Sequence, residues 1–412
     1  MSLLLKAIDA CRLIVGVACG VLSVRLAGWR NPPELQQTLV STGALLMIAF
    51  CLLEFANLAL HRSRSEYLRA RKLRLGISVA ALVTGVYLLS QSHNAFAAVD
   101  GWTSAALAFV CVLGLSKFER LTGRGWLSRQ HPGLIGIAAF AVAIVVGAFL
   151  LKTPNASRTG DPIAWDDAFF TSASAVCVTG LITLDTEGDF SLFGQTVILF
   201  LIQAGGLGIM TWAYLVAVAW GERMSLRDRV VLKDLLTQRS IINFKSRVAT
   251  IVAIMLVVEL CGFGLLYYAW ENLDDEPTNR SFAAAFHSIS AYCNSGFSIF
   301  SGNLEDPRAQ AAQGVTTIVA ILVVLGGLGV PVWDDLIRRS RTWIHNRLRN
   351  EAEETERYFL SLHTKVALAT TALLLVGGTL ALYFADFITF DEAPESWALA
   401  AFDSVTARTA GF

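Results

Sequence analysis

The sequence is short of charge for its length. Only 16% of its 412 residues are charged, whereas 54% are hydrophobic, and the mean hydropathy is +0.55. A soluble globular chain carries about 25% charged residues, so this deficit excludes a water-soluble protein of ordinary composition. We therefore predict an all-α integral membrane protein.

Motifs of several other classes are also lacking. The sequence has no Ser/His/Asp arrangement, no Walker loop and no G-x-G-x-x-G after an expected strand, which argues against an enzyme. No basic patch is interleaved with aromatic residues, which argues against nucleic-acid binding. The sequence has seven cysteines, an odd number, and they lack metal-ligand spacing. Most of them lie in or beside apolar runs. The sequence thus predicts neither catalytic residues nor a cofactor.

Nine runs are apolar enough to suggest membrane spans, each of which needs about 20 residues; the two near 75–90 and 102–116 are shorter than that. We expect spans near residues 11–27, 37–60, 75–90, 102–116, 132–151, 193–219, 248–270, 314–333 and 366–385. The N-terminus carries Lys6 and Arg12 but no small-residue cleavage site, so the first span is expected to be retained.

Basic residues concentrate in alternate connections between these spans. Of the 33 Lys and Arg residues, 24 lie in the connections 61–74, 117–131, 220–247 and 335–365. The intervening connections are poor in basic residues and often acidic. Because positive charge marks the cytoplasmic side, we predict that these four connections and the N-terminus are cytoplasmic.

One short sequence occurs three times on the opposite, outer side: FFTSASAVCVTGL at 169–181, AFHSISAYCNSGF at 285–297 and AFDSVTARTAGF at 401–412. Each copy begins with Phe, one residue and Ser, and each ends in a glycine followed by a large apolar residue. The glycines Gly180, Gly296 and Gly411 lie 116 and 115 positions apart, which indicates a duplicated structural module. The third copy is one residue shorter, so the modules are not equivalent.

The helical part of each copy is too short to cross a membrane. Residues 165–175 would form about 16 Å of helix, half the thickness of a bilayer. Each copy is therefore expected to enter the membrane and return as a polar loop, which is tolerated there only in protein or along a watery cavity. The alternative is a simple connection outside the membrane; three copies at matched spacing favour re-entrant loops.

Such loops offer backbone carbonyl oxygens to a cation. Removing water from a cation at low dielectric is costly, and a ring of carbonyl oxygens offsets that cost where glycine permits the backbone angles. Each short helix also directs its negative C-terminal end toward its loop. The candidate ion-binding residues are Cys177, Val178, Thr179, Gly180, Cys293, Asn294, Ser295, Gly296, Arg408, Thr409, Ala410 and Gly411.

Two further features leave alternatives open. The sequence G-G-L-G occurs at 205–208 and at 326–329, where it either allows close packing or forms a hinge that lines a pore. His287 in the second copy is either a packed, hydrogen-bonded residue or a proton sensor.

The three copies, with GGLGIMT at 205–211, resemble the Trk/Ktr/HKT superfamily of potassium and sodium transport proteins over about residues 130–412. The resemblance implies modules of outer helix, pore helix, filter loop and inner helix, four of which surround one pore. It also implies that Gly180, Gly296 and Gly411 are filter glycines. In the plant branch a serine at the first filter glycine accompanies sodium selectivity, so Gly180 favours potassium as the substrate.

The resemblance further implies partners and a location. Members of the superfamily commonly pair as homodimers in the lipid bilayer and bind a cytosolic nucleotide-binding regulatory ring. The basic inner connections are suitable docking surfaces for such a ring. We expect the plasma membrane, the inner membrane in a bacterium, as the location.

Two departures from the superfamily pattern shape the expected organisation. Residues 1–130 hold about four extra spans of unknown role, ahead of modules at 131–246, 247–364 and 365–412. The sequence ends at Phe412 within the third loop, and the period of about 115 would put a fourth glycine near position 526. We therefore expect a truncated or split transporter that does not conduct alone.

The function that these features favour is potassium uptake through a filter of loop carbonyls. A non-conducting subunit and a sodium-permeable transporter of the same superfamily are the alternatives. A carrier with alternating access is disfavoured, because the polar breaks lie between the spans and not in the middle of them.

Overall fold

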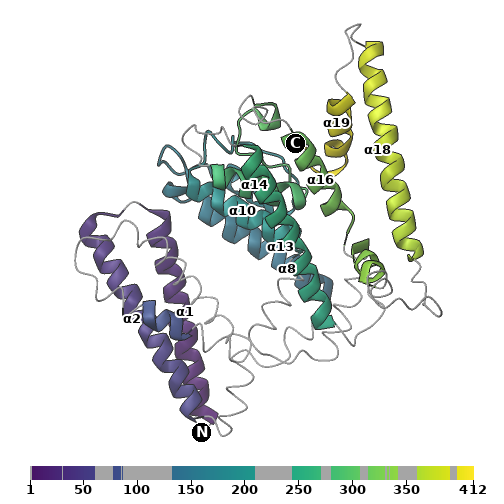
Figure 1. Cartoon of the computed structure of the whole chain (residues 1–412). Coiled ribbons are helices and arrows are strands. Elements are labelled where there is room, and N and C mark those ends of the chain that lie inside the picture. Colours follow the sequence, from purple (N-terminus) through teal and green to yellow (C-terminus); the bar gives the residue numbers. More distant parts are fainter. Residues whose placement is uncertain are drawn as a thin grey trace, which may run out of the picture. The chain divides into compact units, whose positions relative to one another are not determined.

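The computed structural model describes residues 2–29, 31–60, 78–84, 86, 132–208, 244–270, 280–306, 314–329, 332–333, 335–341, 360–389 and 397–412. Within these ranges the regular secondary structure is helical, as Figure 1 shows. The predicted all-α fold is confirmed. The helices outside the three repeated copies include α1 (Ser2–Gly28), α2 (Pro33–Leu60), α8 (Pro132–Leu151), α10 (Leu192–Gly206), α13 (Phe244–Ala269), α16 (Val315–Gly327) and α18 (Leu362–Thr389).

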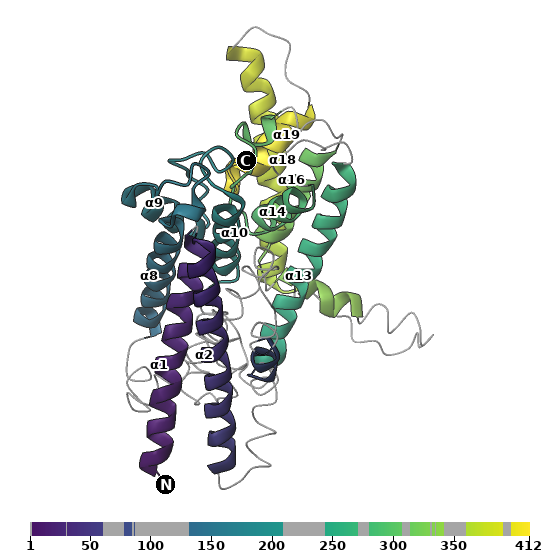
Figure 2. The same cartoon turned by 90° about the vertical axis from the view of Figure 1, so that its left-hand side faces the viewer.

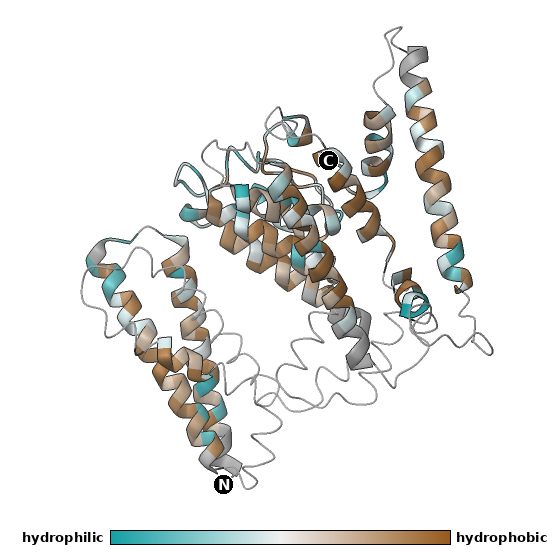
Figure 3. Ribbon diagram, viewed as in Figure 1, coloured by the Kyte–Doolittle hydropathy of each residue, from teal (hydrophilic) through white to brown (hydrophobic). Residues whose placement is uncertain are grey.

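Four of these helices are long and apolar enough to cross a membrane, through the segments Ala7–Gly28, Glu34–Leu58, Thr250–Ala269 and Leu362–Phe384. Apolar stretches of 10–17 residues occur in α8, α10 and α16. Figure 3 shows that α13 and α18 are predominantly hydrophobic along their lengths. The chain is therefore a multi-pass membrane protein. Of the two short expected spans, 102–116 lies outside the described residues, and 75–90 is helical where it is described, at 78–84 and 86.

The two inner helices end earlier than the hydropathy suggests. The expected spans ran to residues 219 and 333, but α10 ends at Gly206 and α16 at Gly327. Gly208 and Gly329 have φ angles of 71° and 77°, the left-handed conformation that ends a helix after its last turn. The expected spans extend past these glycine runs, where residues 209–219 and 330–331 lie outside the described ranges, so their far ends stay a prediction. Hydropathy does not register the change of backbone conformation at the glycines.

The chain folds as two compact units. The first contains α1, α2, α8 and the start of α9 (Trp165–Val176); the second contains the rest of α9 and the helices from α10 onward, apart from the first residues of α13. The expected module boundaries at 130, 246 and 364 stay a prediction. So does the orientation, since most residues of the four basic connections lie outside the described ranges.

In the first unit, α1 and α2 lie side by side (Figures 1 and 2). Their contact is apolar along most of its length, with Cys19, Val40, Met47 and Phe50 buried in one cluster. Small residues such as Ala44 let the two helices approach. The hairpin therefore has its own hydrophobic core.

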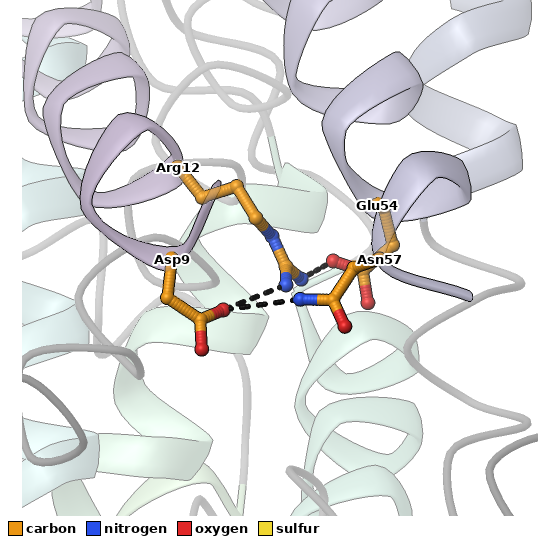
Figure 4. A network of polar contacts seen from close by, with 4 residues as sticks. All are labelled: Asp9, Arg12, Glu54 and Asn57. Atoms are coloured by element: carbon orange, nitrogen blue, oxygen red, sulfur yellow. Dashed lines mark hydrogen bonds and ion pairs between the residues drawn. The ribbon is translucent and has the colours of Figure 1, made fainter. Parts of the chain in front are cut away.

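A polar network crosses the same hairpin (Figure 4). The Arg12 guanidinium is fully buried, pairs with Glu54 on α2, and donates to Asp9 Oδ1 at 3.0 Å. Asn57 Nδ2 donates to the same Asp9 oxygen at 3.2 Å. Because a charge in an apolar span is costly unless it is paired, this network fixes which faces of α1 and α2 meet.

The end of α1 is held by the segment that follows α8. The 3-10 helix η1 (Pro154–Ala156) packs against α1, and Asn155 Nδ2 donates to Ala27 O at 2.8 Å. Gly28 leaves room for Thr153, which a Cβ at this position would approach within 3.0 Å. These contacts attach α8 to the hairpin within the first unit.

In the second unit, short helices pack against long ones. Helix α14 (Arg280–Tyr292) contacts α10 and α16, and α19 (Trp397–Thr409) contacts α16 and α18. A second 3-10 helix, η2 (Asn303–Glu305), follows the loop after α14. This arrangement gathers the repeated copies of the sequence in one place.

Candidate functional site

Three short helices carry the repeated sequence. Helices α9, α14 and α19 have 12, 13 and 13 residues, so each is about 18–20 Å long, roughly half a bilayer. The expected helix over residues 165–175 is confirmed, with α9 extending to Val176. Asp166 and Asp167 in the first turn of α9 complement the positive end of its dipole.

The three loops that follow begin with the same hydrogen bond. A backbone N–H donates to the carbonyl five residues earlier: Thr179 to Ser174 at 2.8 Å, Ser295 to Ser290 at 2.8 Å, and Gly411 to Thr406 at 3.0 Å. This bond closes the helix end and holds the loop close beneath it. The repeat seen in the sequence is thus a repeat of backbone geometry.

The first two loops also share an unusual backbone conformation. Val178 and Asn294 have φ angles of 57° and 59°, and Gly180 and Gly296, two positions later, have 80° and 72°. Left-handed backbone is costly for a β-branched residue such as Val178, so surrounding contacts must hold the loop in place. In the third loop only Gly411 has a positive φ, of 68°, which agrees with its shorter sequence.

The three loops meet backbone to backbone in the second unit. A Cβ on Gly180 would lie within 3.0 Å of the Ser295 carbonyl oxygen, and a Cβ on Gly296 would lie equally close to the Ala410 carbonyl oxygen. Real Cβ atoms do not come so close to oxygen, so only glycine fits at either position. The structure therefore brings the three predicted sets of residues together around the glycines of the first two loops.

Helices α10 and α16 pack against the ends of the short helices α9 and α14 through their glycines. A Cβ on Gly205 would meet the Val176 carbonyl oxygen within 3.0 Å, and a Cβ on Gly326 would meet the Tyr292 carbonyl oxygen within the same limit. Gly206 similarly leaves room for the Cys293 thiol. The close-packing interpretation of the two G-G-L-G runs is confirmed; the hinge stays a prediction.

The second loop is also bonded to its inner helix. With the Asn294 amide oriented so that both of its groups are satisfied, it donates to Val323 O at 2.9 Å and accepts from Gly327 N at 3.1 Å. The Thr409 hydroxyl, at the end of α19, lies 3.3 Å from the same amide. Asn294 thus joins the second loop to α16 and to the end of α19.

Behind the second loop, His287 is buried and fully bonded. Its Nδ1 lies 2.9 Å from Ala283 O, and its Nε2 lies 3.0 Å from the Ser298 hydroxyl in the segment that leaves the loop. Trp270 and Phe300 pack against the ring. The interpretation of His287 as a packed, hydrogen-bonded residue is confirmed.

Acidic side chains join the segment that follows the first loop to the segment that follows the second. Glu187 Oε2 accepts from Ser301 N at 3.0 Å and from Ser301 Oγ at 3.1 Å, and Ser301 Oγ also donates to Asp185. Asp185 is held in turn by Gly188 N at 2.9 Å. The acidic residues were predicted on the outer side, which stays a prediction, and the sequence gave no sign of this clamp.

Glu259 is a further residue that sequence reasoning missed. It is buried on α13, and its carboxylate accepts from the Gln203 amide of α10 at 3.1 and 3.2 Å. An isolated acidic residue in an apolar span is a signal that could have identified it. The pair joins α10 to α13.

The remaining candidate residue of the third copy, Arg408, lies in the last turn of α19 and not in the loop that follows. Its side chain is exposed beside Thr409, on the face that α19 turns toward α16 and α18. Among the described residues no group of three or more His, Cys, Asp or Glu side chains is placed to hold a metal ion.

Comparison with known proteins agrees with these features. Residues 104–412 match the family model of TrkH, described as a cation transport protein. The Ktr system potassium uptake protein B of Bacillus subtilis is 33% identical over 301 residues, which cover 70% of this chain and 61% of that protein. The protein of the same name from Vibrio alginolyticus is 35% identical over 291 residues, 68% of this chain and 59% of that protein.

A third relative carries a broader name. The potassium/sodium uptake protein NtpJ of Enterococcus hirae is 31% identical over 294 residues, which cover 69% of this chain and 60% of that protein. This chain thus spans about 60% of the length of the curated relatives that it matches.

Apolar helices long enough to span a membrane, together with three short helices whose loops converge, define a helical multi-pass membrane protein. Because the TrkH model matches three quarters of the sequence, the chain belongs to the TrkH family of cation transport proteins.

Proposed function

We propose that this chain forms part of a potassium uptake pathway across the plasma membrane. Ions would pass a filter lined by the backbone carbonyls of the three loops, from Cys177 to Thr179, from Cys293 to Ser295 and from Arg408 to Ala410. The observation that carries the proposal is the approach of the three loops, with Gly180 against Ser295 and Gly296 against Ala410.

Elementary electrostatics supports a cation as the passing ion. Three helices end at the loops, so three negative dipole ends lie near their meeting point. A dehydrated cation there would exchange water for carbonyl oxygens, which cost no reorganisation when the backbone is held in advance. The bonds that close each helix end and the packing of Gly205 and Gly326 provide that rigidity.

Potassium is favoured over sodium for two reasons. Gly180 stands where the sodium-selective plant branch of the superfamily has serine, and two of the relatives above are named potassium uptake proteins. The relative from Enterococcus hirae is named for both ions, so a sodium-permeable transporter is the alternative.

The assembly is part of the same proposal. Because the chain spans about 60% of its relatives' lengths, a complete pore would need further protein, and a chain that does not conduct by itself is the second alternative. We further propose a homodimer, a cytosolic nucleotide-binding regulatory ring docked on the basic connections, a cytoplasmic N-terminus and, in a bacterium, the inner membrane.

Complementation of bacteria that lack potassium uptake tests the function. Two proteins are compared: this chain, and a fusion that continues it from the third loop with the third inner helix and the fourth module of the Vibrio alginolyticus relative. We expect the fusion to restore growth at limiting potassium. Growth restored by the chain alone would overturn the need for further protein, and failure of a well-expressed fusion would contradict the proposed function.

Selectivity has a separate test in the fusion. Gly180→Ser should raise the sodium flux relative to potassium, because a side chain there must displace the Ser295 carbonyl. Gly264→Ser on α13 is the matched control, since a Cβ at Gly264 meets nothing within 4 Å. An unchanged flux ratio in Gly180→Ser would count against Gly180 as a filter residue.

A further inference from the structure

The serine that begins each repeated copy has no part in the proposed filter, yet two of these serines make the same contact. Ser288 Oγ on α14 donates to Glu259 O on α13 at 2.7 Å, and Ser404 Oγ on α19 donates to Leu375 O on α18 at 3.0 Å. In both cases donor and acceptor lie 29 positions apart. Each bond joins a short helix to the long helix that precedes it.

A glycine faces each serine on the long helix. Gly262 and Gly378 lie three positions after the accepting residues, on the same helix face. A Cβ on Gly262 would come within 3.0 Å of Ser288 Oγ, and a Cβ on Gly378 within 3.0 Å of Ser404 Oγ. The serine hydroxyl thus contacts the backbone of the long helix directly, in a space that is open only because the facing residue is glycine.

We propose that Ser288 with Gly262, and Ser404 with Gly378, are positioning residues that seat each short helix on its outer helix at a fixed depth and rotation. The ion-selective role of this seat rests on the proposed function; the contact itself does not. We call each pair a Ser–Gly seat.

A short, rigid segment of each helix joins the Ser–Gly seat to the filter loop. Ser288 and Ser404 are buried, and the loops below them are tied to the same helices by the bonds from Ser295 to Ser290 and from Gly411 to Thr406. A displacement of the short helix along its axis would therefore carry its loop with it. Each residue of register corresponds to about 1.5 Å, which is well beyond the roughly 0.5 Å within which a binding site must be held.

The seats are specific features of the helix surfaces. Gly377, next to Gly378, and Gly264, two positions after Gly262, meet nothing within 4 Å. In the sequence, Gly262 and Gly378 each precede their serine by 26 positions, and in the first module Gly147 precedes Ser172 by 25. The spacing is thus identical in the second and third copies and differs by one in the first.

Suppression by a second substitution tests the seat of the third module. Gly378→Ala places a methyl group against Ser404 Oγ, whereas Ser404→Ala removes that oxygen and leaves Ser404 Cβ 3.3 Å away. The double variant Gly378→Ala/Ser404→Ala should therefore tolerate the new methyl group better than Gly378→Ala alone. Gly377→Ala, on the same helix, is the matched control.

The first readout is the apparent Tm of the purified 412-residue chain in detergent. We expect Gly378→Ala to lower the Tm by about 5 °C, as overpacking does, and the double variant to recover at least half of that loss. Gly377→Ala should not lower the Tm. A double variant no better than Gly378→Ala, or a control equally damaged, would overturn the Ser–Gly seat.

The second readout is the potassium-to-sodium flux ratio of the fusion described above. A positioning role requires that Gly378→Ala lowers the ratio and that the double variant restores it toward the wild-type value. An unchanged ratio in Gly378→Ala would overturn the positioning role and leave a packing contact. Suppression of the Tm loss in a fusion that carries no ions at all would contradict the proposed function while the seat stands.

Discussion

The sharpest structural prediction concerns two adjacent glycines on the inner helix α16. A Cβ at Gly326 would fall far inside 3.0 Å from the Tyr292 carbonyl oxygen, a backbone atom that cannot rotate away. A Cβ at Gly327 would meet only the Asn294 side chain, at 3.8 Å, which is ordinary contact. The same substitution at neighbouring positions should thus have opposite effects.

The magnitudes follow from packing and propensity. Gly326→Ala forces α16 and the end of α14 apart by about 1 Å or more, and such overpacking costs about 1–3 kcal/mol. Both substitutions gain about 1 kcal/mol because alanine favours a helix more than glycine does. At Gly327 the added methyl group makes only an ordinary van der Waals contact, so overpacking does not cancel this gain. We expect Gly326→Ala to lower the apparent Tm in detergent by about 4 °C and Gly327→Ala to leave it unchanged or slightly raised.

Thermal unfolding of the purified chain, followed by the surviving size-exclusion peak, measures both variants. Equal Tm values for the two would mean that α16 does not press against the end of α14 through Gly326. That result would refute the reasoning by which the glycine runs hold the loops in place.

Two further predictions concern polar contacts. Arg12→Met leaves the buried Glu54 carboxylate without its guanidinium, which should lower the free energy of unfolding by about 3–5 kcal/mol. The double variant Arg12→Met/Glu54→Met should recover much of that loss. Hydrogen exchange in α1 and α2 measures both variants, and equal exchange in the two would contradict the pairing. Ser301→Ala removes the hydroxyl bonds to Asp185 and Glu187 and should increase hydrogen exchange in residues 181–190 without affecting α14; unchanged exchange in 181–190 would argue against the outer clamp.

Elements defined by local sequence were predictable. The expected span 132–151 matches α8, because a proline opens an unbroken apolar run and a polar segment follows it. The short helix expected over residues 165–175 matches α9 to within one residue, because the polar loop begins where the helical pattern of apolar residues ends. The three candidate loops were found because the repeat marks them, independently of their structure.

Elements that depend on distant contacts were not predictable. The ends of α10 and α16 are set by left-handed glycines, which hydropathy cannot register. The pairing of Glu259 with Gln203 depends on the rotation of two helices 56 positions apart in sequence. The acceptors of Ser288 and Ser404 are backbone carbonyls, which carry no side-chain signature at all.

Anomalous diffraction from crystals of the fusion soaked in rubidium, a heavy stand-in for potassium, tests the central claim most directly. The account predicts a peak at the meeting point of the three loops, surrounded by carbonyl oxygens that include those of Ser295 and Ala410. Ordered rubidium elsewhere in the protein, with none between Gly180, Gly296 and Gly411, would contradict a filter built from these loops.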